Sequence, residues 1–106
     1  MPMQPEAMLV ELIRYNTWAN AQLLAICLQQ SDALLATPIP GAYGSIHKTV
    51  GHMLWAEADY YGRITGQRLQ PATPWEQGPG LAELAEFAPQ IGAAFLDLAQ
   101  RVPLTQ

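Results

Sequence analysis

Apolar residues recur every three or four positions in three long segments of the chain, which is the spacing of one face of an α-helix. The segments run from about 5 to 30, from 46 to 65 and from 81 to 101. In the first segment the repeating positions are Leu9, Leu12, Ile13, Asn16, Asn20, Leu23, Leu24 and Cys27. No segment alternates between apolar and polar residues as a half-buried strand does. The pattern therefore predicts an all-α protein.

Turn-forming residues mark where these segments begin and end. Ser45 is a favourable N-cap for the second segment, and Gly66 is a plausible C-terminal stop. Stretches rich in proline and glycine, residues 37–44 and 67–80, interrupt the helical pattern. We expect Trp75 to anchor the second of these loops on the helices, because a loop rarely carries a large aromatic side chain without burying it.

Three long helices joined by long connections form either a three-helix bundle or three-quarters of an up-and-down four-helix bundle. With 106 residues, the chain is expected to be a single domain covering 1–106. The sequence stops soon after the third segment. From the residues alone both arrangements stay open.

The amino-acid composition indicates which classes of molecule the protein is expected to bind. Charged residues make up 13% of the chain, about half of the roughly 25% found in average globular domains. A surface so poor in charge suggests that a partner subunit or missing chain covers part of it. The net charge is −4 and the five basic residues are scattered, so nucleic-acid binding is not expected.

The sequence also indicates in which compartment the protein is found. The N-terminus lacks the basic region of a signal peptide, and no apolar run approaches the roughly 20 residues that span a bilayer. The single cysteine, Cys27, cannot form an internal disulfide and lies among leucines, which is typical of an inert core thiol. We expect a cytoplasmic protein that does not enter a membrane.

Two histidines in the second segment are the first candidates for chemistry. His47 and His52 are five residues apart, which places them roughly 140° apart around a helix, so they cannot bind one metal ion together. A zinc site in this chain would need carboxylates or another chain. Apart from a functional role, the pattern allows His52 to be a solvent-edge residue paired with Asp59. His47 is expected to be a surface or loop-packing residue.

Glu57 is the second candidate, because it lies near the middle of the apolar stripe of its helix. A carboxylate that faces a core is costly unless it is paired or coordinated. Either Glu57 is functional, or it accepts a hydrogen bond from Tyr15, Asn16 or Asn20 of the facing helix. The two asparagines either cap a neighbouring loop or support a site. Tyr15 and Trp18 are expected to pack inside the bundle.

Several of these residues fall in motifs that resemble a known family. The chain resembles the DinB/YfiT-like proteins, metal-dependent four-helix-bundle enzymes, over about residues 9–66. The motifs that carry the resemblance are Tyr15-Asn16-x-Trp18-Ala19-Asn20, Gly44-Ser45-Ile46, His52-Met53-Leu54-Trp55-Ala56-Glu57 and Arg63-Ile64-Thr65-Gly66.

The resemblance implies a role for each candidate. His52 matches the first of three metal-ligating histidines, which usually hold zinc or nickel. Glu57 matches a commonly acidic position and is expected to be the catalytic residue that orients a metal-bound thiol or water, or exchanges a proton with it. The family's other two ligands form an H-x-x-x-H pair that this chain lacks. The resemblance therefore implies a four-helix domain that is incomplete on its C-terminal side and a divalent-metal site that is incomplete within one chain. A homodimer, common among relatives, is one way to complete the site.

Two functions of different class follow. One is a DinB-like metal-dependent enzyme that carries out thiol-dependent transfer or hydrolase-like chemistry on a small molecule, or an inactive short form of such an enzyme. The alternative is a non-catalytic helical module that homo-oligomerises through exposed helix faces without bound metal. The missing ligand pair, the low charge and the apolar stripe of the third helix support the alternative.

Overall fold

A computed structural model describes residues 4–101 of the chain and shows three long helices, one short helix and one turn of 3₁₀-helix in them. In order these are α1 (Pro5–Leu28), α2 (Asp32–Ala36), α3 (Ile46–Thr65), η1 (Trp75–Gln77) and α4 (Leu81–Arg101). The described residues form no strand, only an isolated bridge between Pro38 and Ser45. The all-α prediction is confirmed.

The ends of α3 show why its boundaries could be predicted. The Ser45 side chain accepts a hydrogen bond from the Lys48 backbone N–H at 3.2 Å, which satisfies a donor that the first helical turn leaves free. At the other end Gly66 adopts a left-handed conformation with φ of 79°, which a residue with a Cβ rarely adopts. Both predicted boundaries are confirmed.

The short helix α2 is absent from the prediction. It starts at Ser31, whose side chain accepts a hydrogen bond from the Leu34 N–H at 3.1 Å, and it buries Leu35. Five residues are too few to show a helical repeat, so only its N-cap could have indicated it. The first long helix correspondingly ends at Leu28 rather than near Gln30.

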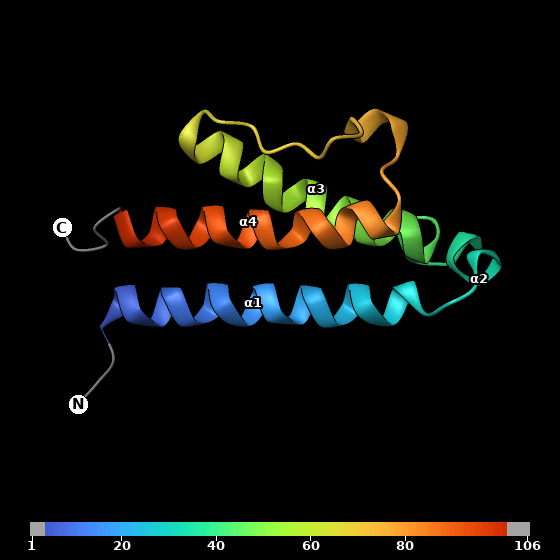
Figure 1. Cartoon of the computed structure of the whole chain (residues 1–106), viewed down its shortest axis with the longest axis horizontal. Helices are drawn as coiled ribbons and strands as arrows, with labels where there is room; N and C mark the ends of the chain where they lie inside the picture. The colour runs from blue at the N-terminus through green and yellow to red at the C-terminus, as the bar shows by residue number, and fades with distance from the viewer. Residues whose placement is uncertain (1–3, 102–106) are drawn as a thin grey trace.

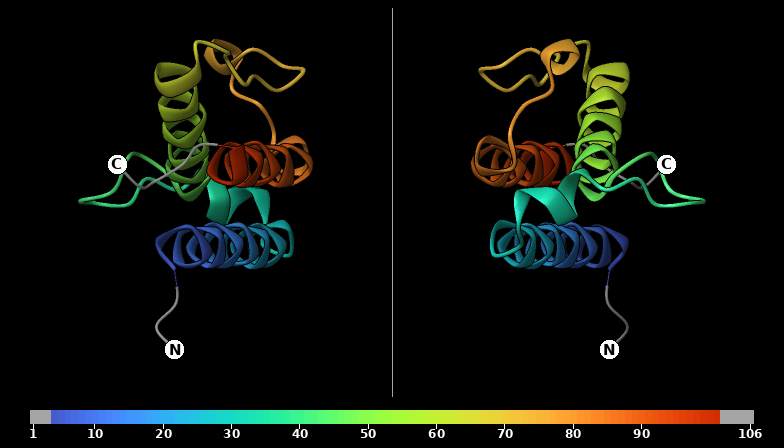
Figure 2. Two further views of the ribbon diagram at one scale, coloured as in Figure 1. Left: turned by 90° about the vertical axis from the view of Figure 1, so that its left-hand side faces the viewer. Right: turned by 90° about the vertical axis from the view of Figure 1, so that its right-hand side faces the viewer.

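The long helices are arranged around α4 (Figure 1). α1 runs antiparallel to α4 along its length, whereas α3 crosses α4 obliquely (Figure 1). Views along the long axis show that α1 and α3 lie on different sides of α4 (Figure 2). The molecule is elongated, with extents of 49 × 31 × 25 Å.

The buried core lies where α4 meets the other helices. Its largest fully buried side chains are Leu24 of α1, Leu54 of α3, and Leu84 and Ile91 of α4. The apolar stripe predicted for the third helix is therefore the centre of the core. Within residues 4–101, no helix has the length and hydropathy needed to cross a membrane.

α1 buries much less of its surface than its sequence suggests. Only Asn20, Leu24 and Cys27 of this helix are buried, while Tyr15 is 65% and Trp18 is 57% exposed. The prediction that Tyr15 and Trp18 pack inside the bundle is wrong. Their rings pack against each other at 5.8 Å instead. The reason is that α4 is the one long helix that packs along α1, so a narrow face of α1 is covered.

The contact that sets this face is a close approach between Thr17 of α1 and Gly92 of α4. A Cβ placed on Gly92 would lie 3.0 Å from the Thr17 Cβ and 2.7 Å from its Cγ2, and closer still to its Oγ1. The Thr17 hydroxyl donates a hydrogen bond to the Ile13 carbonyl at 2.9 Å, which fixes the side chain. Glycine at this position therefore allows the two backbones to approach.

Substituting Gly92→Ala tests this contact. Alanine ordinarily stabilises a helix interior by about 1 kcal/mol relative to glycine. Here the added methyl group meets Thr17, so we expect the free energy of unfolding to fall by about 1–3 kcal/mol, the usual cost of overpacking. Urea denaturation measures the change. Adding Thr17→Ala should recover part of the loss.

Gly51→Ala on α3 is the matched control, because a Cβ there meets only Leu84 Cδ1 at an ordinary 3.8 Å. We expect this variant to be as stable as the parent chain or more stable. Equal stability of the two alanine variants would contradict the close approach of α1 and α4.

Candidate functional site

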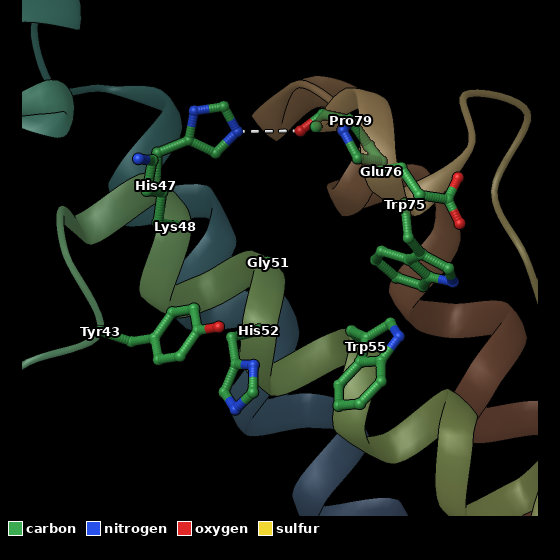
Figure 3. A pocket seen from close by; sticks show the side chains of 10 residues that line it. Tyr43, His47, Lys48, Gly51, His52, Trp55, Trp75, Glu76 and Pro79 are labelled. Carbon is green, nitrogen blue, oxygen red and sulfur yellow. Dashed lines mark hydrogen bonds between the residues drawn. The ribbon is translucent and has the colours of Figure 1, made fainter.

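A pocket of about 540 Å³ lies beside the first half of α3. One wall is α3 itself, the second is the turn that precedes it, and the third is the segment around η1 (Figure 3). The side chains that give the pocket its chemistry are Tyr43, His47, His52, Trp55, Trp75 and Glu76. The pocket thus combines three aromatic rings with two imidazoles and a carboxylate.

The turn before α3 presents Tyr43 to this pocket. Gly41 and Gly44, on either side of it, both have φ of 81°, a left-handed conformation that favours glycine. A hydrogen bond of 2.8 Å from the Ile39 N–H to the Gly44 carbonyl closes the turn. The glycine pair that interrupts the sequence pattern therefore has a structural purpose, which is to direct Tyr43 toward α3.

His52 lies between two aromatic rings at the edge of the pocket (Figure 3). The Tyr43 ring stacks on the imidazole at a centroid distance of 4.0 Å, and the Trp55 ring does so at 5.5 Å. The side chain is exposed, and neither ring nitrogen forms a hydrogen bond within residues 4–101. Because an imidazole binds metals and protons in its ring plane, stacking fixes the ring and leaves its nitrogens free.

The pairing expected between His52 and Asp59 is wrong. The Asp59 carboxylate instead forms a salt bridge with Arg63 at 2.9 Å, one turn further along α3. Arg63 lies one turn from Asp59 on the same helix, the spacing at which helical side chains pair, whereas His52 lies seven residues or about 10 Å away along the axis. His52 is thus left without an acidic partner among the described residues.

His47 has the loop-packing role that its position suggested. Its Nε2 lies 2.9 Å from the Pro79 carbonyl oxygen, and because a carbonyl can only accept, Nε2 carries the proton. The bond joins the start of α3 to Pro79, two residues before α4 begins, and closes one end of the pocket (Figure 3). One of its two nitrogens is therefore already engaged.

The far wall of the pocket is held on α4 by two contacts. Trp75 packs edge-to-face on Phe87 at 5.7 Å, which confirms it as the loop anchor. The Thr73 backbone N–H donates a hydrogen bond of 2.6 Å to the Glu83 carboxylate. Hydrogen bonding from the Thr73 side chain, and then this backbone bond, lowers the pKa of Glu83 because both stabilise the charged form.

Glu57 lies outside this pocket and bridges α3 to α1. Its two carboxylate oxygens accept hydrogen bonds from Asn20 Nδ2 at 3.0 Å and Asn16 Nδ2 at 3.3 Å. Of the partners considered from sequence, the two asparagines are present and Tyr15 is not. His52 and Glu57 therefore point to different sides of α3. The acid–base role implied for Glu57 stays a prediction, and it would require a reacting group on the α1 side of the helix.

The described residues do not complete a metal site. In residues 4–101 no group of three or more His, Cys, Asp or Glu side chains is placed to hold a metal ion. Cys27 is buried, and burial raises the pKa of its thiol, so it is a poor ligand. Within the described residues, His52 is therefore not joined by two further side chains placed to hold a metal ion.

Comparison with known protein families indicates what kind of protein carries this pocket. The sequence model of the DinB family matches residues 3–103, which is almost the whole chain. The chain belongs to the DinB family. Comparisons with curated proteins and with solved structures found no significant match. Membership of the DinB family agrees with the helical fold and confirms the resemblance drawn from residues 9–66, but it does not define a reaction.

The polar bridge between α1 and α3 can be tested with Asn20→Ala and Asn16→Ala. Asn20 is 8% exposed and makes the shorter bond, whereas Asn16 is exposed. Both substitutions change helix propensity equally, so that effect cancels in the comparison. We expect Asn20→Ala to lower the free energy of unfolding by about 1–3 kcal/mol more than Asn16→Ala. Equal losses in denaturation experiments would contradict the bridge.

The hydrogen bond between Thr73 and Glu83, which holds the pocket wall on α4, should weaken at low pH. Because the folded-state pKa of Glu83 is lowered, its contribution to stability is present above the unfolded value of about 4.3 and is lost as pH falls through the folded value. The NMR shift of the Thr73 amide should therefore titrate below pH 4.3. Glu83→Gln should abolish this titration, and Glu86→Gln, three residues along α4, should leave it unchanged.

Proposed function

We propose that this DinB family chain is part of a metal-dependent enzyme that binds a small molecule in the pocket beside His52. His52 supplies one ligand of a divalent metal ion, zinc or nickel, and a second chain supplies the others. One observation carries the proposal: Tyr43 and Trp55 hold the His52 ring in place while both of its nitrogens stay free at an open pocket.

The pocket supports the binding part of the proposal. Its volume falls within the roughly 300–1,000 Å³ that small-molecule sites occupy. Such sites are lined mainly by apolar and aromatic side chains with a few polar groups that orient the ligand. Tyr43, Trp55 and Trp75 supply the aromatic walls, while Glu76 and Lys48 supply charge of both signs.

The metal part of the proposal rests on a single histidine, so it requires further ligands from outside the described chain. Catalytic zinc sites use three protein ligands and keep one position for water or substrate. A homodimer is the proposed source of the missing ligands. A metal held there would lower the pKa of a bound thiol or water, the chemistry that thiol-dependent transfer and hydrolysis need.

A second candidate is the non-catalytic module that homo-oligomerises without metal. It is favoured by a specific observation: α1 carries several large apolar side chains that are half or more exposed, among them Leu12 at 64% and Ile26 at 59%. It also agrees with the lack of a three-ligand group in residues 4–101. The two candidates share a self-associating chain and differ in whether it binds metal.

Native mass spectrometry with added Zn²⁺ or Ni²⁺ tests both candidates in one measurement, because it reports subunit number and metal per subunit. We expect an oligomer with bound metal. His52→Ala should reduce metal binding at least tenfold. His47→Gln is the control, because glutamine keeps a donor for the Pro79 carbonyl and should leave metal binding unchanged.

Equal metal binding by His52→Ala and the parent chain would overturn the assignment of His52. An oligomer that binds no metal would support the second candidate instead. A metal-free monomer would contradict both.

A further inference from the structure

A second pocket, of about 230 Å³, lies along the second half of α3. Two arginines line it, Arg63 from α3 and Arg68 from the loop that follows this helix. Trp55 and Trp75 line it as well, and the same two indoles line the larger pocket beside His52. The second pocket, called the arginine pocket below, therefore adjoins the candidate site across a shared aromatic boundary.

The end of α3 brings the two arginines to one place. Gly66 stops the helix in a left-handed conformation with φ of 79°, and the chain then runs back alongside α3 (Figure 1). A Cβ built on Gly62 would lie 3.8 Å from both the Cα and the Cγ of Arg68, so the returning chain contacts the helix at this point. Arg68 thereby reaches the pocket that Arg63 lines from the helix.

Both guanidinium groups keep donors that are free to bind a ligand. The Asp59 carboxylate pairs with Arg63 Nε at 2.9 Å, which orients the side chain. A guanidinium carries five N–H donors in a planar fork, and within residues 4–101 the terminal nitrogens of Arg63 form no hydrogen bond. Arg68 forms neither an ion pair nor a side-chain hydrogen bond with any residue in that range. The arginine pocket therefore offers unused donors from two side chains.

The charge of the arginine pocket indicates the class of ligand. Among the described residues its charged lining consists of Arg63, Arg68 and Asp59, which leaves one positive charge in excess. A carboxylate neutralises that excess, whereas a phosphate monoester carries about −1.5 to −2 near pH 7 and exceeds it. Arginine forks also bind carboxylates through two parallel hydrogen bonds. The pocket is thus suited to a carboxylate, and the adjoining indoles are suited to an aromatic ring.

We propose that the arginine pocket binds the carboxylate of a small aromatic acid, whose ring lies against Trp55 and Trp75 and extends toward the pocket beside His52. The inference rests on the small-molecule binding proposed above and names the class of substrate, an aromatic carboxylate. It does not depend on whether metal is bound.

An NMR titration of the full chain without added metal tests this proposal. The probes are 2-naphthoate and its uncharged analogue 2-naphthamide, which share one ring system. We expect 2-naphthoate to shift the indole N–H signals of Trp55 and Trp75 and to bind at least tenfold more tightly than 2-naphthamide, as hydrogen bonds to charged groups allow. Trp18, on α1 and outside both pockets, should not shift and serves as the internal reference.

Arg68→Gln tests the assignment to the arginine pocket. Arg68 is exposed and makes no side-chain hydrogen bond within residues 4–101, so its loss should leave the fold unchanged. We expect the Kd of 2-naphthoate to rise at least fivefold and that of 2-naphthamide to change less than twofold. Arg14→Gln is the matched control, because it removes the same charge from α1, outside both pockets. It should leave both Kd values within twofold of the parent chain.

A third probe, 2-naphthyl phosphate, tests the charge argument. Because the arginine pocket has one positive charge in excess, this probe should bind no more tightly than 2-naphthoate. Tighter binding of the phosphate would overturn the assignment to a carboxylate.

The outcomes separate this inference from the proposed function. Equal affinity for 2-naphthoate and 2-naphthamide, or equal losses in Arg68→Gln and Arg14→Gln, would overturn the carboxylate site while binding beside His52 stands. A loss in Lys48→Gln but not in Arg68→Gln would place the carboxylate in the larger pocket and overturn it too. If no probe shifted Trp55 or Trp75, both this inference and small-molecule binding would be overturned. Metal binding at His52 is decided separately by the mass spectrometry above.

Discussion

The close approach of Thr17 on α1 to Gly92 on α4 fixes how these two helices pack, and the exposure of the α1 side chains follows from that packing. It brings α1 and α4 close along one narrow face and so decides which side chains of α1 are buried. Leu24 and Cys27 join the core on that face. The side of α1 that carries Leu12 and Tyr15 points away from α4 and is exposed.

The two candidate functional residues of α3, His52 and Glu57, lie on different sides of the helix. On one side His52 is stacked between Tyr43 and Trp55 at the pocket, and the segment around Trp75 closes the far wall. On the other side Glu57 is held by two asparagines of α1. The residues that the family motif places five positions apart therefore take part in different contacts, one with a pocket and one with a neighbouring helix.

Most of the fold could be predicted from local signals. The three long helices, the Ser45 cap, the Gly66 stop and the Trp75 anchor each depend on residues close in sequence, which the chain shows directly. α2 was missed because five residues carry no periodicity. At the site, the two asparagines were among the partners proposed for Glu57, and the pairing of Asp59 with Arg63 is itself a local contact between residues four apart on one helix. The stacking of Tyr43 on His52 could not be predicted, because it joins α3 to the turn before it.

The sequence by itself determined that this is a helical protein of the DinB family, where its long helices lie, and which histidine and carboxylate are candidates for chemistry. Those properties follow from periodicity, capping and motif spacing, which are local. Only the tertiary structure decided which face of α1 is buried, because an apolar residue such as Leu12 has the same pattern whether it meets α4 or solvent. It also decided that His52 and Glu57 lie on different sides of α3, since their surroundings come from helices and turns distant in the chain.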